Sequence, residues 1–406
     1  MVKLSALSND IKQYLIITGN YWAFTLTDGA LRMLIVLHFH TLGYSPLNIA
    51  MLFLFYEMFG VVTNLVGGYL GARLGLNKTM NIGLGLQVIA LLMLVVPADW
   101  LSVFYVMVAQ ALSGIAKDLN KMSAKSAIKM IVAAGQEGTL FKWVAILTGS
   151  KNALKGVGFF VGGLLLTLVA FQGAILLMAG TLILVWSFSV YALQNDLGKA
   201  KSIPKFTDIL SKSRAINILS GARMFLFGAR DVWFVVALPV FLSQTFNWDH
   251  WTVGGFLALW VIGYGGVQSI APKIIRLSSN ISAAVETSKW AALLSLVTLA
   301  IIVSMHYQWS VQVSIVAGLM LFGAVFAVNS SLHSYLIVSY AKADGVSLDV
   351  GFYYMANAMG RLIGTVLSGW IFQAYGFTAC LLISFLFVVL AGIISSQLPM
   401  QEHATA

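Results

Sequence analysis

The sequence is dominated by long apolar runs that are separated by short polar segments with turn-forming residues. A helix needs about twenty mainly apolar residues to cross the hydrocarbon core of a bilayer, and most of these runs reach that length. Hydrophobic residues make up 59% of the 406 positions and charged residues only 9%, about a third of what a soluble domain carries. Because a water-soluble surface cannot be built from this composition, we expect an all-α integral membrane protein.

The apolar runs predict twelve transmembrane helices with short connections. An even number of crossings puts both ends of the chain on the same side of the membrane. The first residues lack the basic head, apolar core and small-residue cleavage site of a removable signal peptide, so we expect the chain to begin in the cytoplasm. The predicted spans are 14–40, 46–71, 78–97, 101–128, 142–170, 173–193, 214–243, 250–272, 281–305, 310–340, 348–374 and 376–398.

Basic residues occur in every second connection, and short loops that carry Lys or Arg stay in the cytoplasm. The N and C termini are therefore expected to be cytoplasmic, and the net charge of +10 partly reflects this asymmetry rather than nucleic-acid binding. The basic connections carry Lys3, Lys12, Arg73, Lys78, Lys199, Lys201, Lys205, Lys212, Arg214, Lys273, Arg276 and Lys342. No Lys or Arg occurs near Ser45, Asp99, Gln172, Asn247, Gln308 and Tyr375.

The polar stretch 194–213 is the longest connection, and it predicts a linker between an N-terminal six-helix bundle, 1–193, and a C-terminal one, 214–406. An internal repeat supports this division. Gly114 and Asn120 recur 209 residues later as Gly323 and Asn329. A second set of residues recurs after 206 residues: Lys155, Gly158 and Gly163 correspond to Arg361, Gly364 and Gly369. Two parallel six-helix repeats joined by a basic linker resemble the major facilitator architecture.

The connection between the second and third predicted spans resembles the signature G-x-L-x-D-R-x-G-R-K of major facilitators. The positions that agree are Gly68, Leu70, Arg73, Gly75 and Lys78. Ala72 stands where the signature has its aspartate, so the gating ion pair attributed to that aspartate is not expected in this chain.

Many cations lie deep inside the predicted spans, where each Lys or Arg costs about 2.5 to 3.5 kcal/mol and is expected to face the bundle interior or a watery cavity. Four lysines of the fourth span follow one another at intervals of four residues and share one helical face: Lys117, Lys121, Lys125 and Lys129. Because like charges at this spacing repel, we expect the stripe to face an anion. The residues predicted to bind substrate are Arg32, Lys117, Asn120, Lys121, Lys125, Lys151, Lys155, Arg223, Arg230 and Arg361.

Fewer acidic residues lie at the same depth, and the candidates for ion coupling or gating are Asp28, Glu57, Asp118 and Asp231. Structural ion pairing is their alternative role, because three of them adjoin a cation: Asp28 precedes Arg32 by one turn, Asp118 precedes Lys121 by three residues, and Asp231 follows Arg230. The cations left over indicate a multiply charged anionic substrate. Arginine grips phosphate-like oxygens with two parallel hydrogen bonds while lysine acts as a point charge, so the mixed set suits a phosphate or arsenate ester.

Some of these residues also have simpler interpretations. Lys125, Lys129 and Lys142 lie near a cytoplasmic end, where their side chains can extend to the membrane surface without contacting a substrate. Asn120 can hydrogen-bond a neighbouring helix instead of a substrate hydroxyl.

Three segments resemble the ArsJ organoarsenical efflux permeases, a branch of the major facilitator superfamily. They are NYWAFTLTDGALRMLIVLHFH from Asn20 to His40, LSGIAKDLNKMSAKSAIK from Leu112 to Lys129, and LTGSKNALKGVGFF from Leu147 to Phe160. The resemblance runs over nearly the whole chain, and the lysine-rich fourth and fifth spans are its most specific part.

The resemblance implies a transporter of the bacterial inner membrane that exports 1-arseno-3-phosphoglycerate and confers arsenate resistance. It also implies a functional partner, a glyceraldehyde-3-phosphate dehydrogenase that makes this ester from arsenate. We expect a monomer that works by alternating access, with Arg32, Lys151, Lys155, Arg230 and Arg361 holding the anion near mid-membrane. A general organophosphate or organic-anion exchanger is the alternative, because transport direction cannot be read from a sequence.

Other classes of protein fit less well. Cys380 is the only cysteine, which excludes an intramolecular disulfide and a multi-cysteine metal centre. The sequence has no GxxxxGK[ST] nucleotide-binding loop, and no His, Asp or Ser constellation that a membrane-embedded transferase would need. A sensor or scaffold would need a soluble domain, for which the predicted spans leave no room. We therefore expect neither a cofactor, nor a metal, nor an enzymatic activity.

Overall fold

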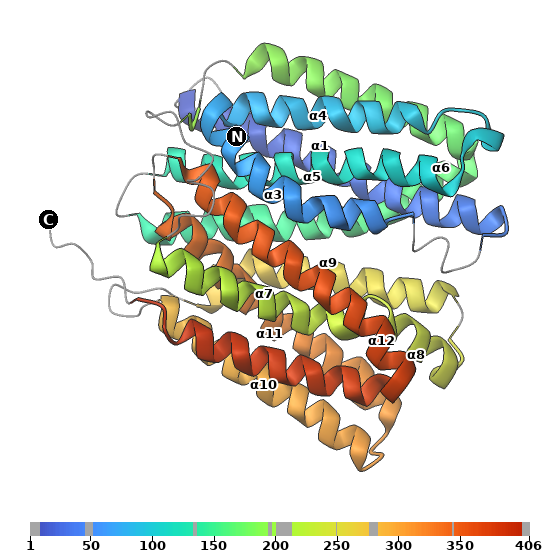
Figure 1. Cartoon of the computed structure of the whole chain (residues 1–406), viewed down its shortest axis with the longest axis vertical. Coiled ribbons are helices and arrows are strands. Elements are labelled where there is room, and N and C mark those ends of the chain that lie inside the picture. Colours follow the sequence, from blue (N-terminus) through green and yellow to red (C-terminus); the bar gives the residue numbers. More distant parts are fainter. Residues whose placement is uncertain are drawn as a thin grey trace, which may run out of the picture. The chain divides into compact units, whose positions relative to one another are not determined.

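The structure is a computed structural model that describes residues 9–44, 52–132, 136–193, 197–199, 213–248, 250–275, 283–342 and 345–399. Helices form all of the regular secondary structure in these ranges, and no strand occurs among them (Figure 1). The helices are α1 (Asn9–Thr41), α3 (Leu54–Leu74), α4 (Leu76–Met93), the 3-10 helix η2 (Ala98–Trp100), α5 (Val103–Ile131), α6 (Glu137–Ala192), α7 (Arg214–Phe234), α8 (Ala237–Phe246), α9 (His250–Ile274), α10 (Ala283–His306), α11 (Val311–Tyr340) and α12 (Val346–Ser395).

Several predicted features lie outside the described residues. They are the basic residues Lys3, Lys201, Lys205, Lys212 and Arg276, the loop position Ser45, most of the linker 194–213, and the first residues of the spans 46–71 and 281–305.

Two helices are too long for a single crossing. α6 has 56 residues, which is about 84 Å of helix against a hydrocarbon core of about 30 Å. Non-helical backbone divides it at Ala170 (φ 56°, ψ −179°) and divides α12 at Gly376 (φ 79°, ψ −177°). Both breaks coincide with predicted boundaries between spans, and they lie 206 residues apart, the offset of the second sequence repeat. In the described part of the chain, seven helices are long and apolar enough to cross a membrane, so the count of twelve spans stays a prediction.

The chain groups into two compact units. The first contains Met1–Leu140, Ser150–Ser211 and Ala341–Met355, and the second contains Phe141–Gly149, Lys212–Tyr340 and Ala356–Ala406. The predicted bundles 1–193 and 214–406 stay a prediction.

Small residues bring the helices of the first unit close together. A Cβ atom on Gly158 of α6 would lie 2.7 Å from the carbonyl oxygen of Leu26 and 3.0 Å from the Cα of Gly29, both on α1. Only glycine permits this approach of two backbones, which is the usual device where helices must associate within lipid. The contact sets Lys155, one turn before Gly158, beside α1.

The first turns of α12 pack against α3 in the same unit. A Cβ atom on Gly351 would lie 2.5 Å from the carbonyl oxygen of Asn64, and Ser347 Oγ donates a hydrogen bond of 2.8 Å to the carbonyl oxygen of Gly68. Gly68 belongs to the signature-like segment, so that segment contributes a helix-packing surface. Gly75 of the same segment has φ 90°, a conformation that glycine adopts without strain, and it separates α3 from α4.

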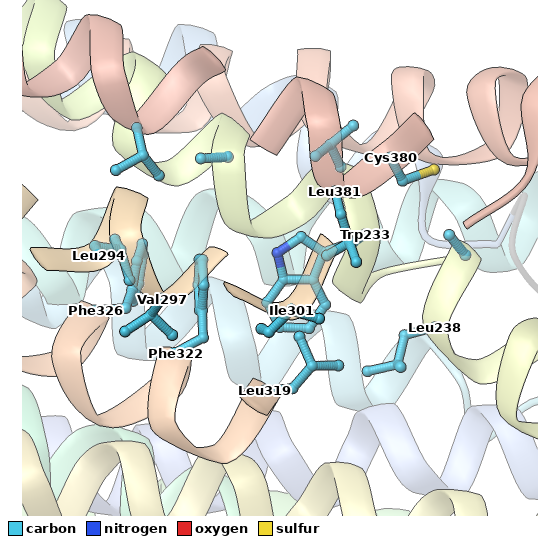
Figure 2. Packing of buried hydrophobic residues seen from close by; sticks show 14 of the residues in the cluster. Trp233, Leu238, Leu294, Val297, Ile301, Leu319, Phe322, Phe326, Cys380 and Leu381 are labelled. Carbon is cyan, nitrogen blue, oxygen red and sulfur yellow. The ribbon is translucent and has the colours of Figure 1, made fainter. Parts of the chain in front are cut away.

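Aromatic and branched side chains fill the core of the second unit (Figure 2). Trp233 of α7 is fully buried and meets Phe322 of α11 edge to face, with ring centroids 5.1 Å apart. Gly364 of α12 approaches α7 as Gly158 approaches α1, because its Cβ would lie 2.8 Å from the carbonyl oxygen of Gly228. Since Gly158 and Gly364 are repeat-related, the two units share this helix contact as well as the sequence spacing.

Gly360 provides a test of this packing. A Cβ atom there would collide with the backbone carbonyl of Met224, and backbone cannot move aside as a side chain can. We expect Gly360→Ala to destabilise the protein by about 1 to 3 kcal/mol, seen as a lower midpoint of thermal unfolding in detergent. Gly369→Ala is the matched control on the same helix, because nothing lies within 4 Å of its Cβ. Equal midpoints for the two variants would contradict the close α7–α12 contact.

Candidate functional site

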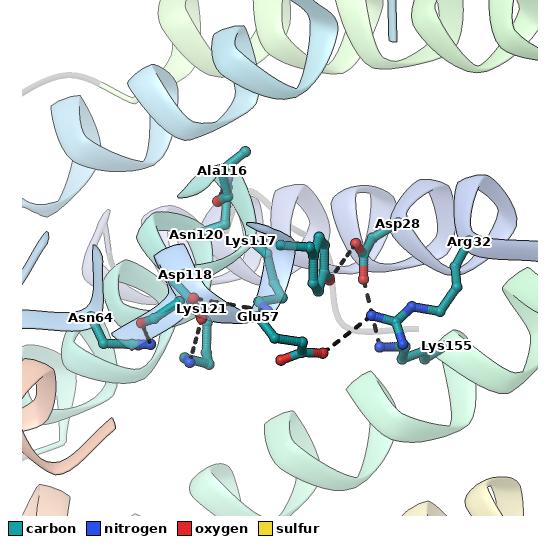
Figure 3. A network of polar contacts seen from close by, with 12 residues as sticks. Asp28, Arg32, Glu57, Asn64, Ala116, Lys117, Asp118, Asn120, Lys121 and Lys155 are labelled. Atoms are coloured by element: carbon teal, nitrogen blue, oxygen red, sulfur yellow. Dashed lines mark hydrogen bonds and ion pairs between the residues drawn. The ribbon is translucent and has the colours of Figure 1, made fainter. Parts of the chain in front are cut away.

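A buried carboxylate lies between two lysines on α5. Asp118 Oδ1 is 2.6 Å from Lys121 Nζ, and Asp118 Oδ2 is 3.8 Å from Lys117 Nζ (Figure 3). The Asp118 side chain is only 1% exposed, so this ion pair is shielded from water and strong. The sequence spacing predicted the pairing of Asp118 with Lys121, and the structure contains it.

An aromatic ring lies close to each of the two ammonium groups. Lys117 Nζ lies 3.9 Å from the ring centroid of Tyr56, and Lys121 Nζ lies 4.4 Å from that of Tyr354. A ring face attracts a cation electrostatically, more so where water is excluded. Neither tyrosine was predicted as a site residue. The sequence held no signal for them, because a tyrosine within a span is usually packing or an interface anchor.

A second carboxylate in the first unit connects α1, α3 and α6. Asp28 accepts a hydrogen bond of 2.7 Å from the Tyr56 hydroxyl, and its Oδ2 lies 3.8 Å from Lys155 Nζ. Arg32 Nη2 lies 3.3 Å from Glu57 Oε1. The structure thus brings together four predicted site residues from three segments of the sequence: Asp28, Arg32, Glu57 and Lys155 (Figure 3).

The second unit holds one carboxylate between two arginines. Asp231 on α7 is fully buried, and its Oδ1 lies 2.5 Å from Arg230 Nη2 while its Oδ2 lies 3.2 Å from Arg361 Nε. Arg361 and Lys155 are repeat-related, so each unit contains a cation from the equivalent helix position paired with an aspartate of α1 or α7. The structure therefore extends the repeat from sequence spacing to a specific ion pair.

Arg223 lies in a separate polar group of the second unit. Its Nε donates to Asn357 Oδ1 at 2.9 Å, its Nη1 donates to the carbonyl and hydroxyl of Ser330 at 3.2 and 3.1 Å, and its guanidinium covers the Phe227 ring at 3.8 Å. The Tyr264 hydroxyl donates to the same Ser330 hydroxyl at 3.0 Å. This network fixes a buried guanidinium in one orientation.

The remaining predicted residues lie elsewhere in the first unit. Lys125 is 2% exposed, with its Nζ 5.9 Å from the Tyr354 ring, so it does not extend to the surface as snorkelling would require. Lys151 is half-buried on α6, one turn before Lys155. Asn120 donates to the Ala116 carbonyl of its own helix at 2.9 Å, and its amide packs against Gly83 of α4. The structure therefore gives Asn120 a packing contact, and a role in substrate binding stays a prediction for it.

Cations exceed carboxylates in both groups of side chains. The first unit brings together Arg32, Lys117, Lys121 and Lys155 with the three acids Asp28, Glu57 and Asp118. The second brings Arg230 and Arg361 to the single acid Asp231. Within the described ranges, no three His, Cys, Asp or Glu side chains are grouped to hold a metal ion. Buried cation-rich groups inside long apolar helices are typical of membrane proteins that move charged solutes.

The sequence of residues 15–287 matches the model of the Major Facilitator Superfamily. This match covers more than half of the chain, so the protein belongs to the Major Facilitator Superfamily. It is a multi-pass membrane transporter of small molecules and not an enzyme, as the sequence predicted. A comparison with curated proteins found no match.

Solved structures of transporters have the same fold. The human organic anion transporter MFSD10 (TETRAN) superposes with a TM-score of 0.76 at 16% identity, covering 96% of this chain and 100% of that one. The E. coli fucose:proton symporter FucP gives 0.74 at 11% identity, with 96% and 98% covered. A bacterial homologue of the iron transporter ferroportin in an outward-facing state gives 0.71 at 12% identity, with 96% and 98% covered. At these identities the likeness concerns the fold, and it confirms the predicted major facilitator fold.

Substitution of Asp231 tests how much this carboxylate stabilises its two partners, Arg230 and Arg361. Asp231→Ala leaves two partly buried arginines without this counter-charge. We expect it to lower the free energy of unfolding by about 3 to 5 kcal/mol. Arg361→Ala leaves Asp231 paired with Arg230, so its loss should be smaller. Glu286→Ala removes an acid from the exposed pair with Lys289 and should cost at most about 1 kcal/mol. The midpoint of thermal unfolding in detergent measures all three, and an Asp231→Ala midpoint equal to that of Glu286→Ala would contradict the role of Asp231.

Proposed function

We propose that this transporter exports an anionic organoarsenical, 1-arseno-3-phosphoglycerate, from the bacterial cytoplasm across the inner membrane. The observation that carries the proposal is the excess of cations over carboxylates in both groups of side chains, with Lys117 and Lys121 in one unit and Arg230 and Arg361 in the other. Such an excess is costly within a membrane and is balanced when an anion binds. The resemblance of three segments to organoarsenical permeases names the anion.

The chemistry of the ester fits the side chains available. It carries an arsenate group and a phosphate group on a three-carbon stem, so it has oxygens of high negative charge at both ends. Lysine ammonium groups attract such oxygens as point charges, while arginine holds two of them at once. The lysines are found in the first unit and most of the buried arginines in the second. Each unit thus contains cations suited to phosphate-like oxygens, and we infer that transport proceeds by alternating access.

The membrane potential can drive this export without a second substrate. Moving one elementary charge through 100 mV is worth about 2.3 kcal/mol, and a multiply charged anion leaves a negative interior downhill. The four candidate ion-coupling acids are all engaged with cations: Asp28 with Lys155, Glu57 with Arg32, Asp118 with Lys121, and Asp231 with Arg230. This engagement favours a role as internal counter-charges over a role as proton carriers.

The ester is made by the dehydrogenase that the resemblance implies as a functional partner. It decomposes after release to arsenate and 3-phosphoglycerate, so export of the ester removes arsenate from the cell. The alternative, a general organophosphate or organic-anion exchanger, would use the same cations but would not need arsenate.

Everted membrane vesicles test the substrate. Vesicles that contain the protein are given arsenate, glyceraldehyde 3-phosphate, NAD and the dehydrogenase, and accumulated arsenic is measured. We expect accumulation that needs all four components. Accumulation of phosphate esters without arsenate would instead establish the general anion exchanger.

A pair of lysine variants tests the site in the same vesicles. Lys121→Ala should abolish accumulation, because it removes the ammonium nearest to Asp118 while the other helices stay in place. Lys289→Ala is the control: this lysine also follows an acid by three residues, but it is 63% exposed and lies outside both cation groups. Full activity of Lys121→Ala, at wild-type amounts of protein in the membrane, would contradict a role for the α5 lysines.

A further inference from the structure

Asp118 and Lys117 face each other without a hydrogen bond. Lys117 Nζ and Asp118 Oδ2 are 3.8 Å apart, too far for a hydrogen bond. Asp118 Oδ2 is buried and accepts no hydrogen bond from any described residue. Among the described residues, the Lys117 ammonium forms an ion pair with this carboxylate and lies 3.9 Å from the centroid of the Tyr56 ring. A buried acceptor without a hydrogen bond is costly. The Lys117 ammonium, whose side chain is 14% exposed, can also hydrogen-bond another partner.

The other two buried aspartates have different sets of partners. Asp28 accepts a hydrogen bond from the Tyr56 hydroxyl in addition to its contact with Lys155. Asp231 accepts hydrogen bonds from Arg230 Nε at 2.6 Å and from Arg361 Nε at 3.2 Å, so both of its oxygens are occupied. Asp118 is therefore the one of these three aspartates with a buried oxygen that accepts no hydrogen bond from a described residue, and an anion that displaces it has to replace one short contact, the one with Lys121.

We propose that Asp118 is an internal substitute for the transported anion, a carboxylate that occupies the two-lysine site while no substrate is bound. Its two oxygens face Lys117 and Lys121, as two oxygens of a phosphate or arsenate group would. A substrate oxyanion brings more charge than one carboxylate and can hydrogen-bond Lys117, which Asp118 does not. Substrate binding then exchanges one anion for another at both ammonium groups, and this inference rests on the proposed transport of an anion.

The exchange explains how a strongly charged ligand can leave a site built from lysines. If Lys117 and Lys121 faced no internal anion, release of the substrate would leave two buried ammonium groups unbalanced, and the substrate would be held tightly. With Asp118 present, its carboxylate returns as the substrate leaves. The aspartate thus lowers the affinity for the anion and raises its rate of release. It competes with the substrate for the two lysines and is not a ligand of the substrate.

Tyr56 and Tyr354 position the two lysines between which the anion is exchanged. The Tyr56 ring contacts the Lys117 ammonium, and the Tyr354 ring contacts the Lys121 ammonium. Because an aromatic ring needs no counter-ion, the lysines keep a fixed position while the anion between them changes. The two rings therefore hold the ammonium groups in the same place whether Asp118 or the substrate is bound.

The test is the binding of a stable phosphate anion to the purified full chain in lipid nanodiscs. Pyrophosphate, inorganic phosphate and 3-phosphoglycerate are titrated by calorimetry into the wild type and Asp118→Asn, an uncharged variant of nearly the same shape. We expect Asp118→Asn to bind pyrophosphate about ten- to a hundredfold more tightly, because a charge-assisted competitor has been removed. In the vesicle assay the same variant should have a lower KM and a lower maximal rate, because release slows.

Glu286→Gln is the matched control, since Glu286 also precedes a lysine by three residues but belongs to an exposed pair. Its affinity for pyrophosphate should equal that of the wild type. Weaker binding by Asp118→Asn would overturn the proposal, because it would show that Asp118 only positions the lysines. Equal binding by Asp118→Asn and the wild type would overturn it too, while leaving anion transport intact.

Failure of the proposed function is distinguishable from this result. If neither the wild type nor Asp118→Asn binds any of the three anions, both the anion-transport proposal and the exchange proposal fall. Binding by the variant alone would support the exchange.

Infrared difference spectra of the wild type keep the proposal testable if Asp118→Asn fails to fold. Protein labelled with carbon-13 in its aspartate carboxylates is compared with and without pyrophosphate. Displacement of Asp118 should shift a labelled carboxylate band on anion binding, because the carboxylate loses its short contact with Lys121. An unchanged aspartate spectrum at saturating pyrophosphate would overturn the exchange.

Discussion

The cost of burying a charge away from water is the constraint on which the rest of this structure depends. A lysine or arginine within an apolar helix must meet a counter-charge, a ring face or a hydrogen-bond acceptor. The chain supplies all three: Asp118 and Asp231 as counter-charges, Tyr56 as a ring face, and Ser330 as an acceptor. Each of these contacts stabilises a cation, and both groups of side chains still contain more cations than carboxylates.

Close backbone contacts make these solutions possible. The ion pair between Asp28 and Lys155 requires α1 and α6 to touch, and the glycines at positions 29 and 158 permit that approach. The ion pair between Asp231 and Arg361 depends in the same way on Gly228 and Gly364. Glycine packing and charge pairing are thus one feature of the fold, repeated in both units. A side chain at any of these glycines would separate the charged partners as well as the helices.

The sequence predicted those features that depend on spacing within one helix. Apolar runs predicted the helices and the breaks at Ala170 and Gly376, and the interval of three residues predicted the pair of Asp118 and Lys121. Contacts between helices were beyond such reasoning. The position of Tyr354 against Lys121 depends on how α12 packs on α3, which no local pattern encodes. Asn120 shows the converse, because its depth suggested substrate contact while its place on the helix turns it toward α4.

The two units differ in how firmly they hold their carboxylates, and that difference has a chemical reason. Arginine donates from several nitrogens in a rigid fork, so Asp231 is bound at both oxygens and stays in place. Lysine offers a compact charge on a flexible stem, and Asp118 is bound closely at one oxygen only. A transporter must release what it binds, so a site needs some cations whose partners can change. We expect the lysines of α5 to be such cations, and we expect the arginines that stay paired with Asp231 to add a constant positive potential.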